Sequence, residues 1–191
     1  IAVPMGFGIV VIAPSFIRAV LGGSWVDMIP AMQILGIYGL LRALGRNFSP
    51  VWKALGRPDL PTKIGIVRIV TVAIFIYPAT KAFGITGTAV VITGLYIVPI
   101  FPIDVYLVAK MIDAKMTAIY AELVYPLVAG GLMAGAAWWV GDTLSVAAPF
   151  KFVAVLLTGL VTYPVTVFLL ESVFNWEIRR DIMMFVDGIK S

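Results

Sequence analysis

The chain has 191 residues, of which 61% are hydrophobic and 13% are charged, and its formal net charge is +4. Soluble domains are about 45–50% apolar and about 25% charged, so this composition excludes an ordinary soluble domain. The mean hydropathy of +1.04 indicates a membrane protein. Cysteine and histidine are both absent from the sequence, which removes thiol chemistry, disulfides and the commonest general base.

Six apolar stretches follow one another along the chain, and a hydrocarbon core of about 30 Å is crossed by about 20 apolar residues. A GGSW turn separates the first two stretches, a polar GRPDLPTK connection follows the second, and an FGITG turn follows the third. We expect helices rather than barrel strands, because the stretches are continuously apolar and show no strict alternation. The predicted spans of this all-α, polytopic membrane protein cover residues 1–17, 28–51, 64–83, 88–109, 123–140 and 149–170.

Residues 1–170 are thus predicted to form one helical lobe in the membrane, with a mixed, interfacial connection at 110–122. In the tail, 171–191, large apolar residues alternate with charged ones, which predicts an amphipathic helix on the membrane surface. The first stretch is short and does not begin with methionine, so we expect the chain to be part of a longer protein.

The basic residues predict the orientation of the lobe, because cytoplasmic connections are enriched in Lys and Arg. Alternate connections place Lys53, Arg57, Lys63, Lys110, Lys115, Arg179, Arg180 and Lys190 on one side, and Arg18, Lys81 and Lys151 on the other. The richer side is expected to face the cytoplasm, and it includes the C-terminus. The basic residues are therefore interpreted as topology signals in a plasma-membrane protein, with membrane lipids and no nucleic acid as partners.

Several basic residues lie inside the second stretch, where a charge is expensive to place in hydrocarbon. On one continuous helix, a stripe would contain Tyr38, Arg42, Arg46, Ser49 and Lys53. One interpretation is that the long side chains extend their charges to the headgroups. The other is that the stripe faces an inward-opening cavity that attracts an anion such as phosphate or pyrophosphate, since a guanidinium offers paired donors to such oxygens.

A second pair of charges lies at similar depth in the third and fourth stretches. Arg68 lies five residues after Lys63, and Asp104 lies six residues before Lys110. Because the two stretches are expected to be antiparallel neighbours, the pair is interpreted as a structural ion pair, with a role in substrate or proton handling as the alternative. No motif of the sequence predicts a metal site or a cofactor.

Three segments together resemble a known family. Residues 20–44 (VLGGSWVDMIPAMQILGIYGLLRAL), 50–70 (PVWKALGRPDLPTKIGIVRIV) and 81–96 (KAFGITGTAVVITGLY) resemble the C-terminal region of polysaccharide biosynthesis proteins, the lipid-linked oligosaccharide flippases. These proteins belong to the multidrug/oligosaccharidyl-lipid/polysaccharide exporter superfamily. The resemblance covers roughly residues 20–110, and beyond that it depends on the number of spans.

The resemblance implies that the chain is most of the C-terminal lobe of a two-lobed flippase with about fourteen helices, whose N-terminal lobe is a partner. It implies alternating access that carries a polyprenyl-pyrophosphate-linked glycan from the inner to the outer leaflet. It makes Arg42 and Arg46 candidates for contacting the pyrophosphate or the sugars, with Tyr38, Ser49 and Lys53 beside them.

Three other functions remain open from the residues alone. A cation-coupled multidrug antiporter of the same superfamily needs a deep acid, and the one available here is Asp104. A lipid-modifying membrane enzyme would need a histidine or an acid cluster, whereas the remaining acids are scattered singly among loops and span ends, so no enzyme activity is expected. A structural membrane subunit is the third alternative, and Arg42 argues against it.

Overall fold

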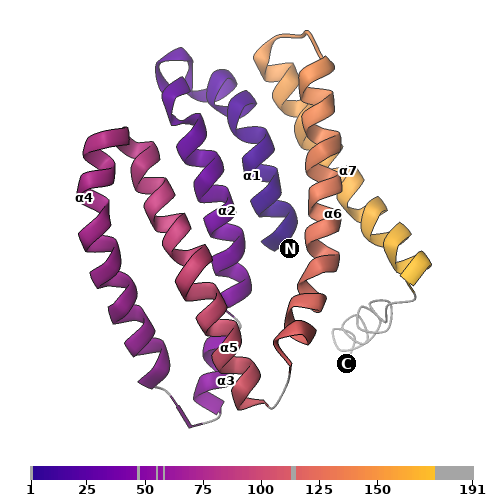
Figure 1. Cartoon of the computed structure of the whole chain (residues 1–191). Helices are drawn as coiled ribbons and strands as arrows, with labels where there is room; N and C mark the ends of the chain where they lie inside the picture. Colours follow the sequence, from indigo (N-terminus) through magenta and orange to yellow (C-terminus); the bar gives the residue numbers. More distant parts are fainter. Residues whose placement is uncertain (1, 47, 55, 58, 113–114, 175–191) are drawn as a thin grey trace, which may run out of the picture.

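The computed structural model describes residues 2–46, 48–54, 56–57, 59–112 and 115–174, and all of its regular elements are helices. The prediction of an all-α, polytopic membrane protein is confirmed for these residues. The expected amphipathic tail lies largely outside them, because only 171–174 are described, as the end of the last helix. The α-helices are α1 (Ala2–Phe16), α2 (Ile29–Gly45), α3 (Phe48–Ala54), α4 (Asp59–Leu95), α5 (Phe101–Met111), α6 (Met116–Thr143) and α7 (Ala148–Phe174) (Figure 1).

The helix named α4 is a hairpin. Gly84 has φ 59° and ψ −144°, a backbone conformation open to glycine and strained for other residues, and it reverses the chain. The side-chain oxygens of Thr80 and Thr88 lie 2.6 Å apart across the reversal. Gly87 lies so close to the carbonyl group of Ala79 that a Cβ atom would clash with it. The reversal therefore produces two antiparallel arms, 59–83 and 84–95.

The second arm continues without interruption through a short π-helix, η3 (Tyr96–Ile100), into α5. Pro99 lies in this π-turn, where its missing N–H group is accommodated by the wider winding. Five helical stretches of the described chain are long and apolar enough to cross a membrane, and one of them, Asp59–Met111, is the hairpin. Counting its two arms separately gives six long apolar stretches in the described chain, and the bounds of the six predicted crossings stay a prediction.

The second predicted span, 28–51, lies within one apolar stretch, Gly23–Trp52, but this stretch is not one continuous helix. The helix α2 ends at Gly45, and α3 begins at Phe48. Pro50 explains the break, because a proline within a continuous helix would clash with the carbonyl of Arg46 four residues earlier, whereas it fits the first turn of a new helix. Within the predicted connection 110–122, the helix α6 already begins at Met116.

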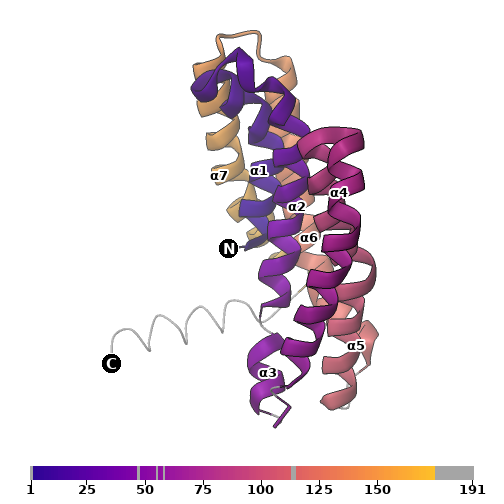
Figure 2. The ribbon, with the colours of Figure 1, turned by 90° about the vertical axis from the view of Figure 1, so that its left-hand side faces the viewer.

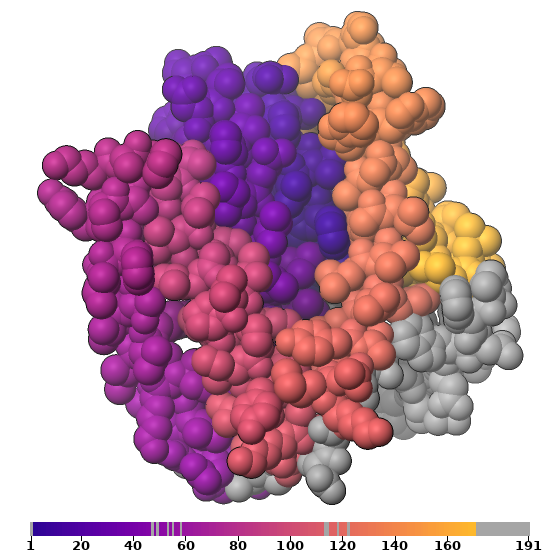
Figure 3. Space-filling model, in the orientation of Figure 1, coloured from indigo at the N-terminus to yellow at the C-terminus, as the bar shows by residue number. Residues whose placement is uncertain are grey.

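The connections gather at two opposite ends of the bundle, as the alternation of spans requires (Figure 1). One end holds α3, the start of α4, the end of α5 and the start of α6. The other end holds the turn made by η1 (Ile17–Leu21) and η2 (Gly23–Met28), the Gly84 reversal and the α6–α7 connection. Figure 2 shows α3 beyond the end of α2, next to the start of α4. Figure 3 shows the face that Figure 1 turns toward the reader. This face is hollowed between α4–α5 and α6, and α1 and α2 lie behind the hollow.

Candidate functional site

A polar pocket of about 540 Å³ lies between α2, α3, the first arm of α4, η3 and α5. Arg42 and Arg46 reach it from the end of α2, Arg68 from α4 and Asp104 from α5. The two groups of charges that the sequence suggested separately therefore line one site. Its complete lining is Arg42, Gly45, Arg46, Trp52, Pro61, Ile64, Gly65, Arg68, Tyr96, Ile100 and Asp104.

Arg42 is oriented by aromatic residues. Its Nη1 atom donates a hydrogen bond of 2.7 Å to the hydroxyl of Tyr38, and its guanidinium carbon lies 5.8 Å from the centre of the same ring. The Tyr38 ring meets the Tyr96 ring edge to face, with 5.5 Å between their centres. Tyr38 thus holds Arg42 without neutralising it. Ser49 and Lys53, the other predicted members of the stripe, belong to α3, and their side chains are outside the described part of the structure.

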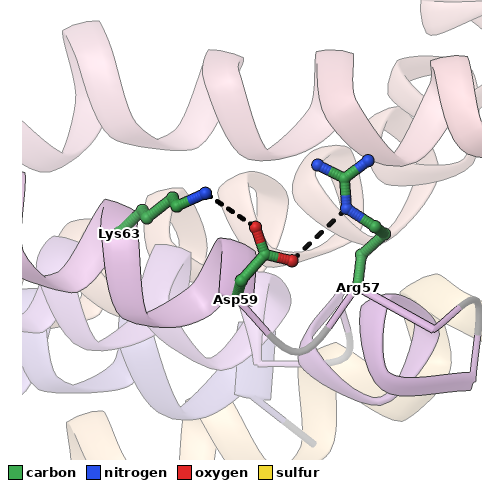
Figure 4. A network of polar contacts seen from close by, with 3 residues as sticks. All are labelled: Arg57, Asp59 and Lys63. Atoms are coloured by element: carbon green, nitrogen blue, oxygen red, sulfur yellow. Dashed lines mark hydrogen bonds and ion pairs between the residues drawn. The ribbon is translucent and has the colours of Figure 1, made fainter.

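The three guanidinium groups of the pocket have no carboxylate partner within 4.0 Å among the described residues. The ion pairs found among the described residues lie elsewhere, in an exposed network at the start of α4 (Figure 4). They are Arg57–Asp59 at 3.3 Å and Lys63–Asp59 at 2.8 Å. Exposed pairs of this kind contribute little to stability, because water and salt screen them. Their effect is local: Arg57 and Lys63 share the carboxylate of Asp59, whereas the guanidinium groups of the pocket remain available to a ligand.

Asp104 and Trp52 line this pocket, and each also has a fully buried polar atom. Asp104 is 6% exposed and Trp52 is 4% exposed. Neither Oδ1 of Asp104 nor Nε1 of Trp52 has a hydrogen-bond partner among the described residues. Arg68 and Asp104 line the same pocket. Their charged atoms lie more than 4.0 Å apart, so the two side chains share the pocket without forming a direct ion pair.

A tightly packed wall supports the carboxylate side of the pocket. Tyr96, Ile100, Phe101 and Val105 form a buried cluster in η3 and α5, and Val105 is completely buried. On the facing helix, a Cβ atom at Gly45 would collide with the hydroxyl of Tyr96, so the close approach of α2 to η3 requires glycine there. Asp104 is therefore held by a rigid part of the molecule.

Sequence reasoning missed Gly45, Trp52 and Tyr96. Tyr96, Ile100 and Asp104 are four residues apart, so they follow one face of a helix, and this spacing could have identified Tyr96. Trp52 had no comparable signal, because an aromatic residue in an apolar stretch is ordinary. Its position depends on the separate helix α3.

The chemistry of the pocket fits an anion that contains phosphate. Guanidinium groups form paired, charge-assisted hydrogen bonds with phosphate oxygens. No group of three or more Asp, Glu, His or Cys side chains within the described residues could hold a metal ion. The guanidinium groups that line the pocket can make such contacts directly.

Comparisons with known proteins agree with the resemblance seen in the sequence. The chain is 26% identical over 129 residues to the teichuronic acid biosynthesis protein TuaB of Bacillus subtilis (strain 168), which covers 66% of this chain and 26% of that protein. It is 31% identical over 65 residues to the lipopolysaccharide biosynthesis protein WzxC of Escherichia coli (strain K12), covering 34% of this chain and 13% of that protein. An uncharacterised membrane protein in the cps region of Klebsiella pneumoniae is 27% identical over 87 residues, 46% of this chain and 18% of that protein.

The matched segments amount to about a quarter or less of the length of these relatives. No family model matches the chain, and no solved structure matches it. The helices, the charged pocket and the relatives all agree with the conclusion that follows. The chain is a multi-pass membrane protein similar to polysaccharide biosynthesis proteins, as its sequence indicated.

Proposed function

We propose that this chain is one lobe of a flippase that moves a polyprenyl-pyrophosphate-linked oligosaccharide across the cytoplasmic membrane by alternating access. The observation that carries the proposal is the pocket in which Arg42, Arg46 and Arg68 converge without carboxylate partners within 4.0 Å among the described residues. Two names among the relatives, which refer to teichuronic acid and lipopolysaccharide biosynthesis, support a polysaccharide precursor as the cargo.

The pocket lies at the end of the bundle that holds α3 and the start of α4 (Figure 1). That end carries Arg57, Lys63, Lys110 and Lys115, whereas the opposite end carries Arg18, Lys81 and Lys151. By the positive-inside rule, the pocket then opens toward the cytoplasm, where lipid-linked precursors are made, and the C-terminus is cytoplasmic. A second lobe, outside this chain, would supply the opposite wall of the transport path.

In this mechanism, the arginines bind the pyrophosphate and keep its charge away from the hydrocarbon of the bilayer. A charged group at mid-bilayer costs about 2.5–3.5 kcal/mol or more, so the headgroup needs a polar path. Rocking of the two lobes would then expose the site to the other leaflet, as in other carriers with alternating access. The lobe binds and orients its cargo, and no covalent step is required.

A cation-coupled drug antiporter is the less favoured alternative. Its coupling acid would have to be Asp104, the one acid among the lining residues of the pocket. Three guanidinium groups in the same pocket oppose the binding of a cation there. The same charges favour an anionic cargo.

The test is removal of charge in the full-length protein. The triple variant Arg42→Ala, Arg46→Ala, Arg68→Ala should lower the flipping rate of lipid-linked oligosaccharide in proteoliposomes at least tenfold, because each charge-assisted hydrogen bond contributes about 1.5–3 kcal/mol. Arg57→Ala is the matched control, an arginine at the same end that is already paired with Asp59. Normal flipping by the triple variant, or an equal loss in the control, would exclude the pocket as the binding site.

A further inference from the structure

A second charged pocket, of about 220 Å³, lies at the end of the bundle opposite the arginine pocket, between η1, the end of α6 and the start of α7. Arg18, Asp142 and Lys151 line it. Among the described residues, no carboxylate lies within 4.0 Å of either cation, that of Asp142 included. Arg18 and Asp142 are exposed and Lys151 is half-buried, so a ligand can reach all three side chains.

An apolar cavity of about 530 Å³ adjoins this charged pocket, because Val11, Ala137 and Val155 line both. Ala137 and Val155 are 4% and 1% exposed, so this side of the cavity is closed by the packed helices α6 and α7. Met5 and Leu160 line the same cavity and are exposed. The cavity is therefore a groove that is open at the surface of the bundle.

The three charges all lie on the same side of the shared apolar residues. The helices α1 and α6 run toward this end of the bundle, and α7 runs away from it (Figure 1). On each helix the charged residue lies nearer this end: Arg18 follows Val11, Asp142 follows Ala137, and Lys151 precedes Val155. With a rise of about 1.5 Å per residue, these spacings place the charges roughly 6–10 Å beyond the apolar residues. The result is a charged head above an apolar groove.

Tryptophan side chains mark the depth of this site in the membrane. Trp138 lines the charged pocket, and Trp138 and Trp139 are both exposed. Exposed tryptophan is enriched where the hydrocarbon meets the lipid headgroups. The charged pocket then lies at headgroup level, and the groove extends into the hydrocarbon. By the count of basic residues made above, the headgroups at this end are those of the outer leaflet.

A ligand that fits both parts needs an anionic head and an apolar chain. We propose that a phospholipid with one net negative charge binds here, with its phosphate at Arg18 and Lys151 and one acyl chain in the groove. Guanidinium and ammonium groups both bind phosphate oxygens. With Asp142, the pocket has a formal charge of +1, which balances such a lipid and favours it over a more highly charged lipid pyrophosphate.

This lipid site is separate from the proposed transport function. The charged pocket and the groove share no lining residue with the arginine pocket. The bound lipid would join α1 to the pair α6–α7 by filling the groove between them. Because it binds only the folded arrangement, it would stabilise that arrangement by mass action.

The test uses the purified full-length protein in micelles of a non-ionic detergent. The probe is phosphatidylglycerol with a diazirine on one acyl chain, and mass spectrometry locates the cross-links after illumination. They should concentrate on groove-lining residues of α1 and α7. Unlabelled phosphatidylglycerol should suppress them at a concentration about fivefold lower than phosphatidylcholine, since one basic charge near a membrane surface contributes an effect of that size.

Two pairs of variants test the head and the groove separately. Lys151→Gln should abolish the preference for phosphatidylglycerol, whereas Lys81→Gln, at the same end but outside both cavities, should keep it. Gly8→Leu should abolish cross-linking in the groove, because Gly8 lines the groove and a Cβ atom there meets nothing within 4 Å. Gly131→Leu on α6 is its control, with equally free space and no place in the lining.

Phosphatidylglycerol should also raise the midpoint of thermal unfolding of the unmodified protein and of Lys81→Gln, and it should do so less for Lys151→Gln. Equal competition by the two lipids, a preference that survives Lys151→Gln, or cross-links spread equally over the exposed face of α4 would overturn the proposal. So would displacement of the probe by inorganic phosphate or by polyprenyl phosphate at lower concentrations than phosphatidylglycerol. None of these results bears on the arginine pocket, so the transport proposal stands or falls by its own test.

Discussion

Two cavities of nearly equal size in this helical bundle have contrasting linings, one apolar and one charged. One, of about 530 Å³, lies mainly between α1, α6 and α7, and no charged residue lines it. The other, of about 540 Å³, lies between α2 and α5 and contains three arginines and Asp104. Because the two volumes are nearly equal, cavity volume alone does not identify a binding site in this protein. The first cavity offers hydrocarbon contacts, which select by shape, whereas the second can select by charge and hydrogen bonding.

The largest expected effect comes from placing a charge in the apolar cavity. Met133 on α6 is 3% exposed and lines this cavity. Met133→Lys should lower the free energy of unfolding by about 3 kcal/mol or more, since the ammonium group would have no water and no partner there. Met133→Leu conserves volume and should change it by less than about 1.5 kcal/mol.

Both variants can be measured by denaturant unfolding in micelles. Equal stability of the lysine and leucine variants would mean that water fills the apolar cavity. The contrast between the two cavities would then disappear.

A smaller effect is expected where α2 meets the wall of the polar pocket. Gly45→Ala would drive a methyl group into the hydroxyl of Tyr96, and overpacking of this kind destabilises by about 1–3 kcal/mol. Gly39→Ala on the same helix is the control, because a Cβ atom there meets nothing within 4 Å. Thermal unfolding compares the two. A Gly45→Ala protein as stable as the control would show that α2 and η3 do not pack as closely as the structure has them.

The smallest expected effect is on ligand affinity at the polar pocket, with the fold left intact. Tyr38→Phe removes the hydroxyl that holds Arg42 and keeps the ring that packs on Tyr96. Loss of one hydrogen bond corresponds to about 1 kcal/mol, so affinity for geranyl pyrophosphate should fall about fivefold. Stability should change by less than about 0.5 kcal/mol. Unchanged affinity, measured by isothermal titration calorimetry of the full-length protein in nanodiscs, would mean that Arg42 needs no support from Tyr38.

Hydropathy predicted the crossings well, because a helix long enough for a bilayer leaves a strong and local pattern in the sequence. The break after Gly45 was also readable in principle, since Pro50 conflicts with the carbonyl of Arg46 in a continuous helix. Depth along the spans suggested Arg42 and Arg46 as one group, and Arg68 and Asp104 as another.

The meeting of these two groups was not predictable, because it depends on how α2 crosses η3 and α5. That crossing is set by close contacts such as Gly45 with Tyr96, which leave no periodic signal. Trp52 reaches the pocket through the same tertiary arrangement. Local sequence therefore indicated which residues carry the chemistry, whereas only packing shows which of them act together.

The central claim is that the arginine pocket is an aqueous, ligand-binding space within a lobe otherwise surrounded by lipid. The chain contains no cysteine, so single cysteines can be introduced in it without a background from its own thiols, once any cysteine elsewhere in the full-length protein is replaced. Ile64 lines the pocket, whereas Ile66, two residues further along α4, is 57% exposed and does not line it.

In the full-length protein in membranes, Ile64→Cys should react rapidly with a charged, water-soluble thiosulfonate, and geranyl pyrophosphate should protect it. Ile66→Cys should react slowly and without protection. Slow labelling at 64 with fast labelling at 66, or labelling at 64 that geranyl pyrophosphate does not slow, would contradict the claim.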